Sequence, residues 1–288
     1  MGGKKISLVN NVKILVEISR PINILMVIFG VVITLLAGLE RVPPFELLLP
    51  AVIAAASIAA AGNAINDYYD IQIDRINRPD RPLPSGKITQ RGIWAYAIVL
   101  FAVGIIVSLL LAFSNFVLAL VNSVLLGVYA YRLKRSGFFG DIVISYLVAS
   151  VFIFAALAIH SLKIGFILAV AAFFTNAARE VLKDLEDMRG DKLFGARTLP
   201  TLIGRKKSVI IVSSFLVVSI LVSPFPFTLG ILDWPYLAIV IIADLIFAYI
   251  IYLLNKKADQ KTVAINQRLI KFGALIGLFA FLAGALPI

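Results

Sequence analysis

Nine apolar stretches of about 20 residues each constrain the fold of this chain more than any other feature of its sequence. A helix needs about 20 apolar residues to cross the hydrocarbon core of a bilayer. Inside a bilayer, only helices and closed barrels satisfy their own backbone hydrogen bonds. The sequence therefore predicts an all-α membrane protein, a bundle of nine transmembrane helices at residues 21–39, 45–66, 92–113, 115–133, 141–160, 163–182, 208–229, 234–254 and 268–286.

The composition excludes a soluble protein. Of the 288 residues, 61% are hydrophobic, whereas a soluble domain has about 45–50% apolar residues. The chain contains no cysteine, which excludes disulfide and thiolate chemistry. A net charge of +11 would suggest a nucleic-acid partner in a soluble protein. In a membrane protein the rule that basic loops stay in the cytoplasm explains this charge, and no nucleic acid is expected.

Lysine and arginine concentrate on one side of the predicted bundle. That side carries 25 of the 27 basic residues, in the N-terminal segment and in loops 67–91, 132–140, 179–207 and 255–271. We therefore expect a multi-pass cell-membrane protein with a cytoplasmic N-terminus and a cytoplasmic-facing active site. Residues 1–20 are expected to form an interfacial helix, with a solvated basic tail as the alternative.

An acidic motif occurs twice near this basic side. Asp67, Asp70 and Asp74 follow the pattern Asp-x-x-Asp-x-x-x-Asp, which Asp184, Asp187 and Asp191 repeat 117 residues later. At about 100° per residue, each trio falls on one face of a helix. Asn63 and Glu180, four residues upstream, fall on the same two faces. The repeat predicts two four-helix units plus a ninth helix, within a single domain over residues 1–288 whose active-site loops are 67–91 and 179–207.

The chemistry of these motifs favours a magnesium–phosphate site. Clustered carboxylates repel one another unless cations neutralise them, and Mg²⁺ binds carboxylate oxygens together with substrate phosphates. Arginine forks suit phosphate oxygens. A salt-bridged loop that merely obeys the charge rule is the alternative. The basic residues that accompany the motifs are Arg75, Arg78, Arg81, Lys87, Arg179, Lys183, Arg189, Lys192 and Arg197.

These residues resemble the UbiA superfamily of intramembrane prenyltransferases. The resemblance lies in the sequence from Asn66 to Asp74, in the Arg-Pro-Leu-Pro-Ser-Gly loop at 81–86, and in the second acidic motif. It implies Mg²⁺-dependent transfer of an isoprenyl group from a diphosphate to an acceptor. It also implies two Mg²⁺ ions, one held by Asn66, Asp70 and Asp74 with Asp67 close behind, and one held by Asp184, Asp187 and Asp191. Asp70, Asp74, Asp187 and Asp191 would then be catalytic.

The resemblance implies further site residues. Tyr131 would present an aromatic face to the allylic carbocation left by the diphosphate, although an interfacial aromatic belt would also account for a tyrosine there. Arg20 and Asn23 would contact the diphosphate, although a juxtamembrane anchor is as good an account. The expected substrate-binding residues are Arg20, Asn23, Asn63, Arg78, Arg81, Lys87, Tyr129, Lys134, Arg179, Lys183, Arg189 and Arg197.

The acceptor is suggested by the second motif. Arg179 to Asp191 most resembles superfamily members of archaeal ether-lipid synthesis, which transfer a geranylgeranyl group to the free hydroxyl of geranylgeranylglyceryl phosphate. The expected partners are therefore a prenyl diphosphate donor, a lipid-like phosphorylated acceptor and membrane lipids. An aromatic quinone precursor is the alternative acceptor. A transporter is a remote alternative, because these acids cluster at one membrane face rather than at the midplane.

Two further acidic residues lie in or beside predicted spans. Asp141 follows Gly140 and is expected to cap the fifth helix. Asp244 lies inside the eighth helix, where an ionisable group suggests a function, but a hydrogen bond within the bundle would also satisfy it.

Overall fold

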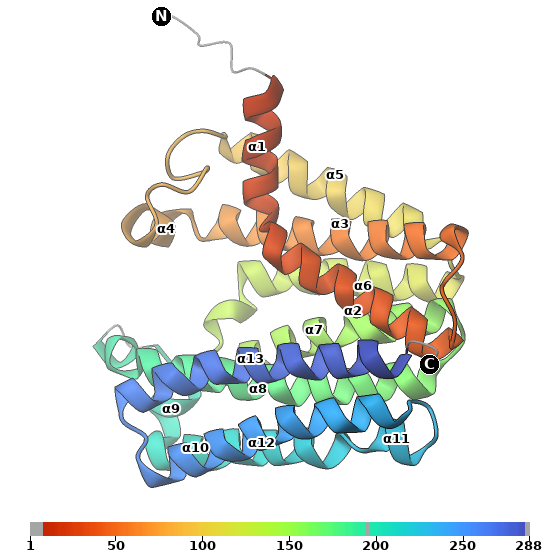
Figure 1. Ribbon diagram of the computed structural model, residues 1–288. Coiled ribbons are helices and arrows are strands. Elements are labelled where there is room, and N and C mark those ends of the chain that lie inside the picture. Colours follow the sequence, from red (N-terminus) through yellow and green to blue (C-terminus); the bar gives the residue numbers. More distant parts are fainter. Residues whose placement is uncertain (1–7, 194–195, 286–288) are drawn as a thin grey trace, which may run out of the picture. The chain divides into compact units, whose positions relative to one another are not determined.

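The computed structural model describes residues 8–193 and 196–285, and this described part of the chain folds into helices (Figure 1). In chain order they are α1 (Leu8–Ser19), α2 (Pro21–Leu39), α3 (Phe45–Tyr69), α4 (Ile71–Asn77), α5 (Gln90–Ser108), α6 (Phe113–Tyr131), η1 (Leu133–Arg135), α7 (Phe138–Ala158), α8 (Leu162–Leu193), α9 (Leu199–Ile203), α10 (Arg205–Val222), α11 (Phe225–Thr228), α12 (Trp234–Lys256) and α13 (Gln260–Ala285).

The predicted number of transmembrane helices is confirmed. Within residues 8–193 and 196–285, nine helices are long and apolar enough to cross a membrane. The largest difference from the prediction is α8, whose 32 residues extend well beyond the expected end at residue 182. At 1.5 Å per residue α8 is about 48 Å long, against a hydrocarbon core of about 30 Å. The polar end of α8, which carries the second motif, therefore extends beyond the hydrocarbon.

The chain divides into two compact units, each of which is described by itself. Unit 1 comprises Met1–Phe29 and Leu49–Tyr131, and unit 2 comprises Gly30–Leu48 and Arg132–Ile288. The first acidic motif lies in unit 1 and the second in unit 2. The last crossing from unit 1 to unit 2 follows α6, the fourth span, but unit 2 also includes Gly30–Leu48. The two units therefore differ from two consecutive four-helix halves, and the duplication stays a prediction.

Unit 1 packs α5 and α6 against α3. Gly104 of α5 lies so close to α3 that an added Cβ would sit 2.9 Å from the carbonyl oxygen of Ala54. Small residues permit such close approach between transmembrane helices. Eight residues further along α3, Gly62 faces the side chain of Leu126 on α6. The buried cluster nearest the first motif consists of Ile18, Ala64, Ile65, Ile71, Leu83, Ile93, Ala97 and Ala130.

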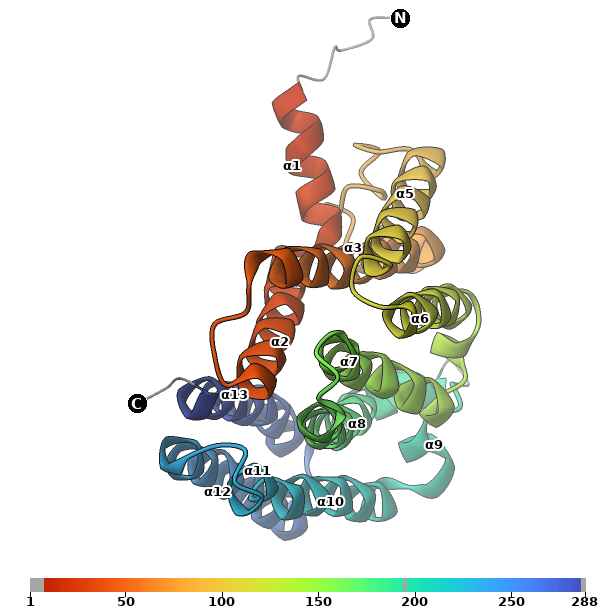
Figure 2. The same cartoon turned by 90° about the vertical axis from the view of Figure 1, so that its right-hand side faces the viewer.

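The central helix of unit 2 is α8. It packs against α7, α10 and α13, and α12 pairs with α13 (Figure 2). The helix that carries the second motif thus packs against three other helices of this unit. The buried cluster of this unit includes Val181, Leu182 and Leu185, which lie on α8 between the motif residues.

Asp244 is satisfied by hydrogen bonding inside unit 2. The Ser223 hydroxyl at the end of α10 donates to Asp244 Oδ2 at 2.5 Å. The Tyr236 hydroxyl donates to the Ser223 carbonyl. These bonds tie α12 to the turn that follows α10, so Asp244 has a structural role at this place.

The N-terminal segment is described from Leu8 onward. Lys4 and Lys5 of the expected interfacial helix lie outside the described residues, while α1 itself is helical up to Ser19. Val12 and Val16 expose 54% and 50% of their surface, and such apolar exposure suits contact with lipid. The interfacial placement of this helix stays a prediction.

Candidate active site

The first acidic motif spans the junction of α3 and α4. Helical backbone hydrogen bonds continue through it, from the Asp70 N–H to the Asn66 carbonyl at 2.9 Å and from the Asp74 N–H to the Asp70 carbonyl at 2.8 Å. Arg81 Nη1 donates to both Asp67 Oδ1, at 3.2 Å, and Asp74 Oδ2, at 2.6 Å. Since one nitrogen reaches both carboxylates, they lie on one face, as their spacing predicts.

A second arginine binds the same motif. Arg20 follows α1, and its backbone φ of 55° lies in the left-handed region, which residues other than glycine rarely adopt. Its guanidinium donates to Asp67 Oδ1. The side chains of Asp67 and Asp74 are only 7% exposed, and buried charges need partners. Arg20 and Arg81, which we expected to bind phosphate, are therefore the counter-ions of the first motif in this structure.

The first motif retains oxygen atoms that fit a cation. Asn66 Oδ1 is buried without a hydrogen-bond partner, which costs free energy unless a donor or cation satisfies it. Asp67 and Asp74 each use one carboxylate oxygen for the arginines. Within the described residues, their other oxygens accept no hydrogen bond. Amide and carboxylate oxygens are ligands that Mg²⁺ prefers, so this donor set fits that ion.

The second motif lies near the end of α8. This helix is continuous through Asp184, Asp187 and Asp191, so the three residues share a face. Asp184 Oδ2 is buried and has no hydrogen-bond partner. Asp191 Oδ2 accepts a hydrogen bond from Thr198 Oγ1 at 3.2 Å. The second motif thus also presents an unsatisfied carboxylate oxygen, and its donor set fits Mg²⁺ in the same way.

Asp141 belongs to this site, and our sequence analysis missed it. The expected capping role is wrong, because Gly137 is the N-cap residue of α7 and Asp141 lies in the first helical turn. The helix begins three residues earlier than predicted, which turns Asp141 toward α8, where Asp184 and Glu180 are among its charged neighbours. Asp141 Oδ2 is buried without a hydrogen-bond partner. A carboxylate one turn inside an apolar helix was the signal that could have identified it.

Glu180 is neutralised by two basic residues of its own helix. Arg179 donates to Glu180 Oε1, and Lys183 Nζ lies 3.5 Å from Glu180 Oε2. The Glu180 side chain is 10% exposed, so this buried charge is compensated on both oxygens. Arg179 and Lys183, which we expected to bind substrate, are therefore engaged with a carboxylate here.

Neither motif forms a complete metal site by itself. Among the residues that the structure describes, no three acidic or histidine side chains gather closely enough to hold a metal ion. Mg²⁺ usually binds one or two carboxylates and completes its shell with water and substrate phosphates. Each motif by itself could therefore supply only part of a coordination shell.

An aromatic pair adjoins the first motif. The rings of Tyr131 on α6 and Tyr69 on α3 lie 5.4 Å apart between centroids, and Tyr69 directly precedes Asp70. Tyr68 packs edge-on against Tyr69 at 5.1 Å. The sequence predicted Tyr131 as a site residue, and its role stays a prediction. The contact between Tyr131 and Tyr69 was not predicted, because the contact joins segments 62 residues apart.

The remaining expected substrate-binding residues lie mostly at the surface. Asn63 differs, because its Nδ2 donates to the Ser19 carbonyl at 2.9 Å and so joins α3 to the end of α1. Tyr129 is half-buried on α6. Their roles toward substrate stay predictions. The expected residues with exposed side chains are Asn23, Arg78, Lys87, Lys134, Lys183, Arg189 and Arg197.

The segment after the second motif is held by a glycine contact. Gly137 has a φ of +63°, and an added Cβ would lie 1.9 Å from the Arg197 carbonyl oxygen. Only glycine permits this backbone approach. The contact fixes the segment that carries Thr198, the residue that donates to Asp191.

Comparison with known proteins gives one consistent result. Residues 25–284 match the UbiA prenyltransferase family. A digeranylgeranylglyceryl phosphate synthase from Pyrococcus horikoshii is 41% identical over 276 residues, which cover 95% of this chain and 98% of that protein. The protein of the same name from Methanosphaera stadtmanae is 36% identical over 271 residues, 94% of this chain and 98% of that protein.

Solved structures agree. A structure described as digeranylgeranylglyceryl phosphate synthase in membranes has a TM-score of 0.86 and 33% identity, over 96% of this chain and 99% of that chain. A UbiA homolog from Archaeoglobus fulgidus, bound to GPP and Mg²⁺, has a TM-score of 0.61 and 19% identity, over 94% of this chain and 98% of that chain. At that identity the likeness concerns the fold alone.

Proposed function

Because this chain belongs to the UbiA prenyltransferase family, we propose that it transfers a geranylgeranyl group from geranylgeranyl diphosphate to the free hydroxyl of geranylgeranylglyceryl phosphate. The observation that carries this proposal is the 41% identity, over 95% of the chain, to a protein named for that synthesis. The chain is a multi-pass membrane prenyltransferase. Its reaction would take place at the cytoplasmic face, where the basic loops are expected.

The two acidic motifs would hold two Mg²⁺ ions. In unit 1 the ligands would come from Asn66, Asp70 and Asp74, and in unit 2 from Asp184, Asp187 and Asp191. The unpartnered oxygens Asn66 Oδ1 and Asp184 Oδ2 support this assignment. Bound there, Mg²⁺ would neutralise the charge that develops on the departing diphosphate.

The basic residues of the chain would bind the phosphate oxygens that remain. Arg78 and Lys87 follow the first motif and have exposed side chains. They can therefore turn to a substrate without leaving a buried carboxylate unpaired. Arg20 and Arg81 would instead fix the orientation of Asp67 and Asp74, since a preoriented charge costs no rearrangement during the reaction.

The paired rings of Tyr69 and Tyr131 would lie beside the prenyl end of the donor and stabilise the cation that forms there. Cleavage of the C–O bond leaves an allylic cation, and an aromatic ring face attracts a cation within about 6 Å. Tyr131 is 67% exposed, so its ring is accessible to a ligand. The acceptor oxygen then bonds to the allylic carbon and loses its proton to a site carboxylate or to the released diphosphate.

The experiment is a transfer assay with the full chain in lipid nanodiscs. Labelled geranylgeranyl diphosphate is offered with geranylgeranylglyceryl phosphate or with a hydroxybenzoate acceptor, in Mg²⁺ or in EDTA. We expect Mg²⁺-dependent transfer to the glyceryl phosphate only. Transfer only to the aromatic ring would contradict the proposed acceptor.

The same assay tests the metal assignment. Asp70→Ala and Asp187→Ala should each reduce transfer at least about a hundredfold, since each removes a proposed metal ligand. Normal turnover by both variants would contradict the assignment. Circular dichroism of each variant in the same nanodiscs is the control for folding.

A further inference from the structure

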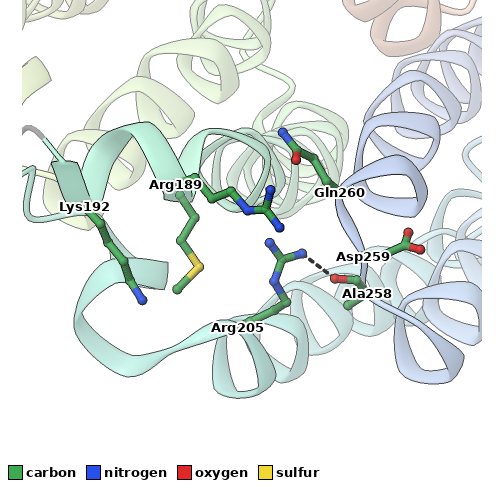
Figure 3. Close-up of a pocket in the computed structure, with 7 residues that line it drawn as sticks. Arg189, Lys192, Arg205, Ala258, Asp259 and Gln260 are labelled. Carbon is green, nitrogen blue, oxygen red and sulfur yellow. Dashed lines mark hydrogen bonds between the residues drawn. The ribbon is translucent and has the colours of Figure 1, made fainter.

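A second charged region lies in unit 2, beside the last turns of α8, on a different face of that helix from the acidic motif. It is a pocket of about 500 Å³ formed by the last turns of α8, the start of α10 and the segment that joins α12 to α13 (Figure 3). This volume falls in the range of about 300–1,000 Å³ that small-molecule sites occupy. Its lining residues are Met188, Arg189, Lys192, Arg205, Ala258, Asp259 and Gln260.

Three basic residues line the pocket, and its one acidic residue does not neutralise them. Asp259 Oδ2 is 2.9 Å from Lys257 Nζ, and Asp259 Oδ1 accepts a bond from the Thr262 N–H at 2.8 Å, which caps α13. These bonds hold the pKa of Asp259 below its usual range. The Asp259 carboxylate is therefore ionised, but its charge is paired with Lys257 rather than with the basic residues of the pocket. In Figure 3 the Asp259 carboxylate points away from the guanidinium groups.

Among the residues that the structure describes, the basic side chains of the pocket have no acidic partner. Arg205 donates to the carbonyls of Ala258 and Leu185, which fix its guanidinium but leave its charge uncompensated. Within the described residues, neither Arg189 nor Lys192 forms an ion pair or a side-chain hydrogen bond. Figure 3 shows the guanidinium groups of Arg189 and Arg205 pointing toward one another. Two neighbouring guanidinium groups repel one another because both are positively charged. An anion bound between Arg189 and Arg205 would remove that repulsion.

The pocket is separate from the proposed metal site. Asp184, Asp187 and Asp191 share one face of α8. Arg189 is two residues beyond Asp187, about 200° around the helix, and therefore points to the opposite side. A ligand in the pocket is thus not the diphosphate that the acidic motif would hold.

We propose that this pocket is a second anion site, which binds a phosphate group between Arg189, Arg205 and Lys192. Two guanidinium forks match the oxygens of a phosphate. The pocket lies at the polar ends of membrane-spanning helices, where basic pockets meet lipid head groups. Its volume also admits the glycerol that esterifies such a phosphate. A soluble phosphate has the same chemistry, and the experiment separates the two sources.

The variants remove positive charge at exposed side chains, so we expect them to fold like the wild type. Arg189→Gln combined with Lys192→Gln eliminates two positive charges from exposed side chains that lack partners. Arg205 is left intact, because its bonds to two carbonyls support the fold. The matched control is Lys206→Gln combined with Lys207→Gln, which eliminates the same charge from exposed positions on α10 that do not line the pocket.

Binding is measured on the purified full chain, stripped of lipid, in two arms. In the first, native mass spectrometry follows titration with phosphatidic acid, a lipid phosphate monoester, against phosphatidylcholine as the zwitterionic reference. In the second, calorimetry follows titration with inorganic phosphate alone. The thermal midpoint of each variant, compared with wild type, checks that it is folded.

We expect the pocket variant to lose affinity about tenfold or more, since it loses two charge-assisted bonds to the anion, and the control to change less than about twofold. Loss confined to the lipid arm identifies a head group, and loss in the soluble arm identifies free phosphate. No binding in either arm, or equal losses in both variants, overturns the proposal. It does not rest on the proposed transfer reaction, because neither arm measures turnover.

Discussion

Arg81→Ala should destabilise the protein strongly, because it removes the partner that two buried carboxylates share. Arg81 Nη1 bridges Asp67 and Asp74, whose side chains are 7% exposed. Without it, Asp74 has no ion-pair partner among the described residues, while Asp67 keeps Arg20. The loss therefore falls mainly on one carboxylate.

The expected magnitude is about 3 kcal/mol. Removing one partner of a buried ion pair costs about 3–5 kcal/mol. Arg81 is 22% exposed, so water reaches the cluster and screens the remaining charge. We therefore expect the lower end of that range.

The assay is unfolding in mixed micelles with increasing SDS, followed by circular dichroism, in EDTA and in Mg²⁺. Mg²⁺ should restore part of the loss in Arg81→Ala, because a cation at Asp74 replaces the missing charge. Arg78→Ala is the matched control, since Arg78 is exposed, and it should change stability by less than about 0.5 kcal/mol. Equal losses in the two variants would refute the proposed role of Arg81.

Three further predictions concern other contacts. Gly137→Ala should destabilise the protein by about 2 kcal/mol or more in the same SDS assay, because its Cβ would meet the Arg197 carbonyl at a positive φ. Asp141→Asn should raise the thermal midpoint in EDTA but not in saturating Mg²⁺, because it relieves repulsion with Glu180 and Asp184 only where no cation already does so; a rise of the same size in both conditions would contradict this account. Tyr131→Phe should retain transfer, whereas Tyr131→Leu should reduce it about tenfold in the nanodisc assay, because only the aromatic face is lost; equal activity of the two variants would contradict an aromatic role.

The spans could be predicted from the sequence because membrane insertion depends on local composition. Each apolar run is recognised without knowledge of the rest of the chain, and the nine expected spans agree in number with the helices of span length in residues 8–193 and 196–285. The length of α8 could not be predicted in this way. Its last turns are polar, and they receive hydrogen bonds from Thr198 to Asp191 and from Arg205 to the Leu185 carbonyl. A hydropathy pattern does not contain such long-range bonds.

The common face of each acidic motif could also be predicted, because helical spacing fixes it. The partners of the acids could not. Arg81 is seven residues from Asp74 and was expected to bind phosphate, yet the turn after α4 directs it back to the carboxylates. Asp141 is 43 residues from Asp184, and only the packing of α7 on α8 brings them together. Long-range contacts of this kind leave no local pattern in a single sequence.

The surroundings of the two acidic motifs share an electrostatic arrangement that the motifs themselves do not reveal. In unit 1, buried Asp67 is neutralised by Arg20 and Arg81. In unit 2, buried Glu180 is neutralised by Arg179 and Lys183. Near each motif, one buried acidic residue is thus neutralised by basic residues of the same unit. The two acidic residues occupy different positions of the repeat. A metal ion would gain little from replacing these pairs, because a buried charge would then lose its partner. It would gain most at two buried oxygens that have no partner among the described residues, Asn66 Oδ1 beside the first motif and Asp184 Oδ2 in the second.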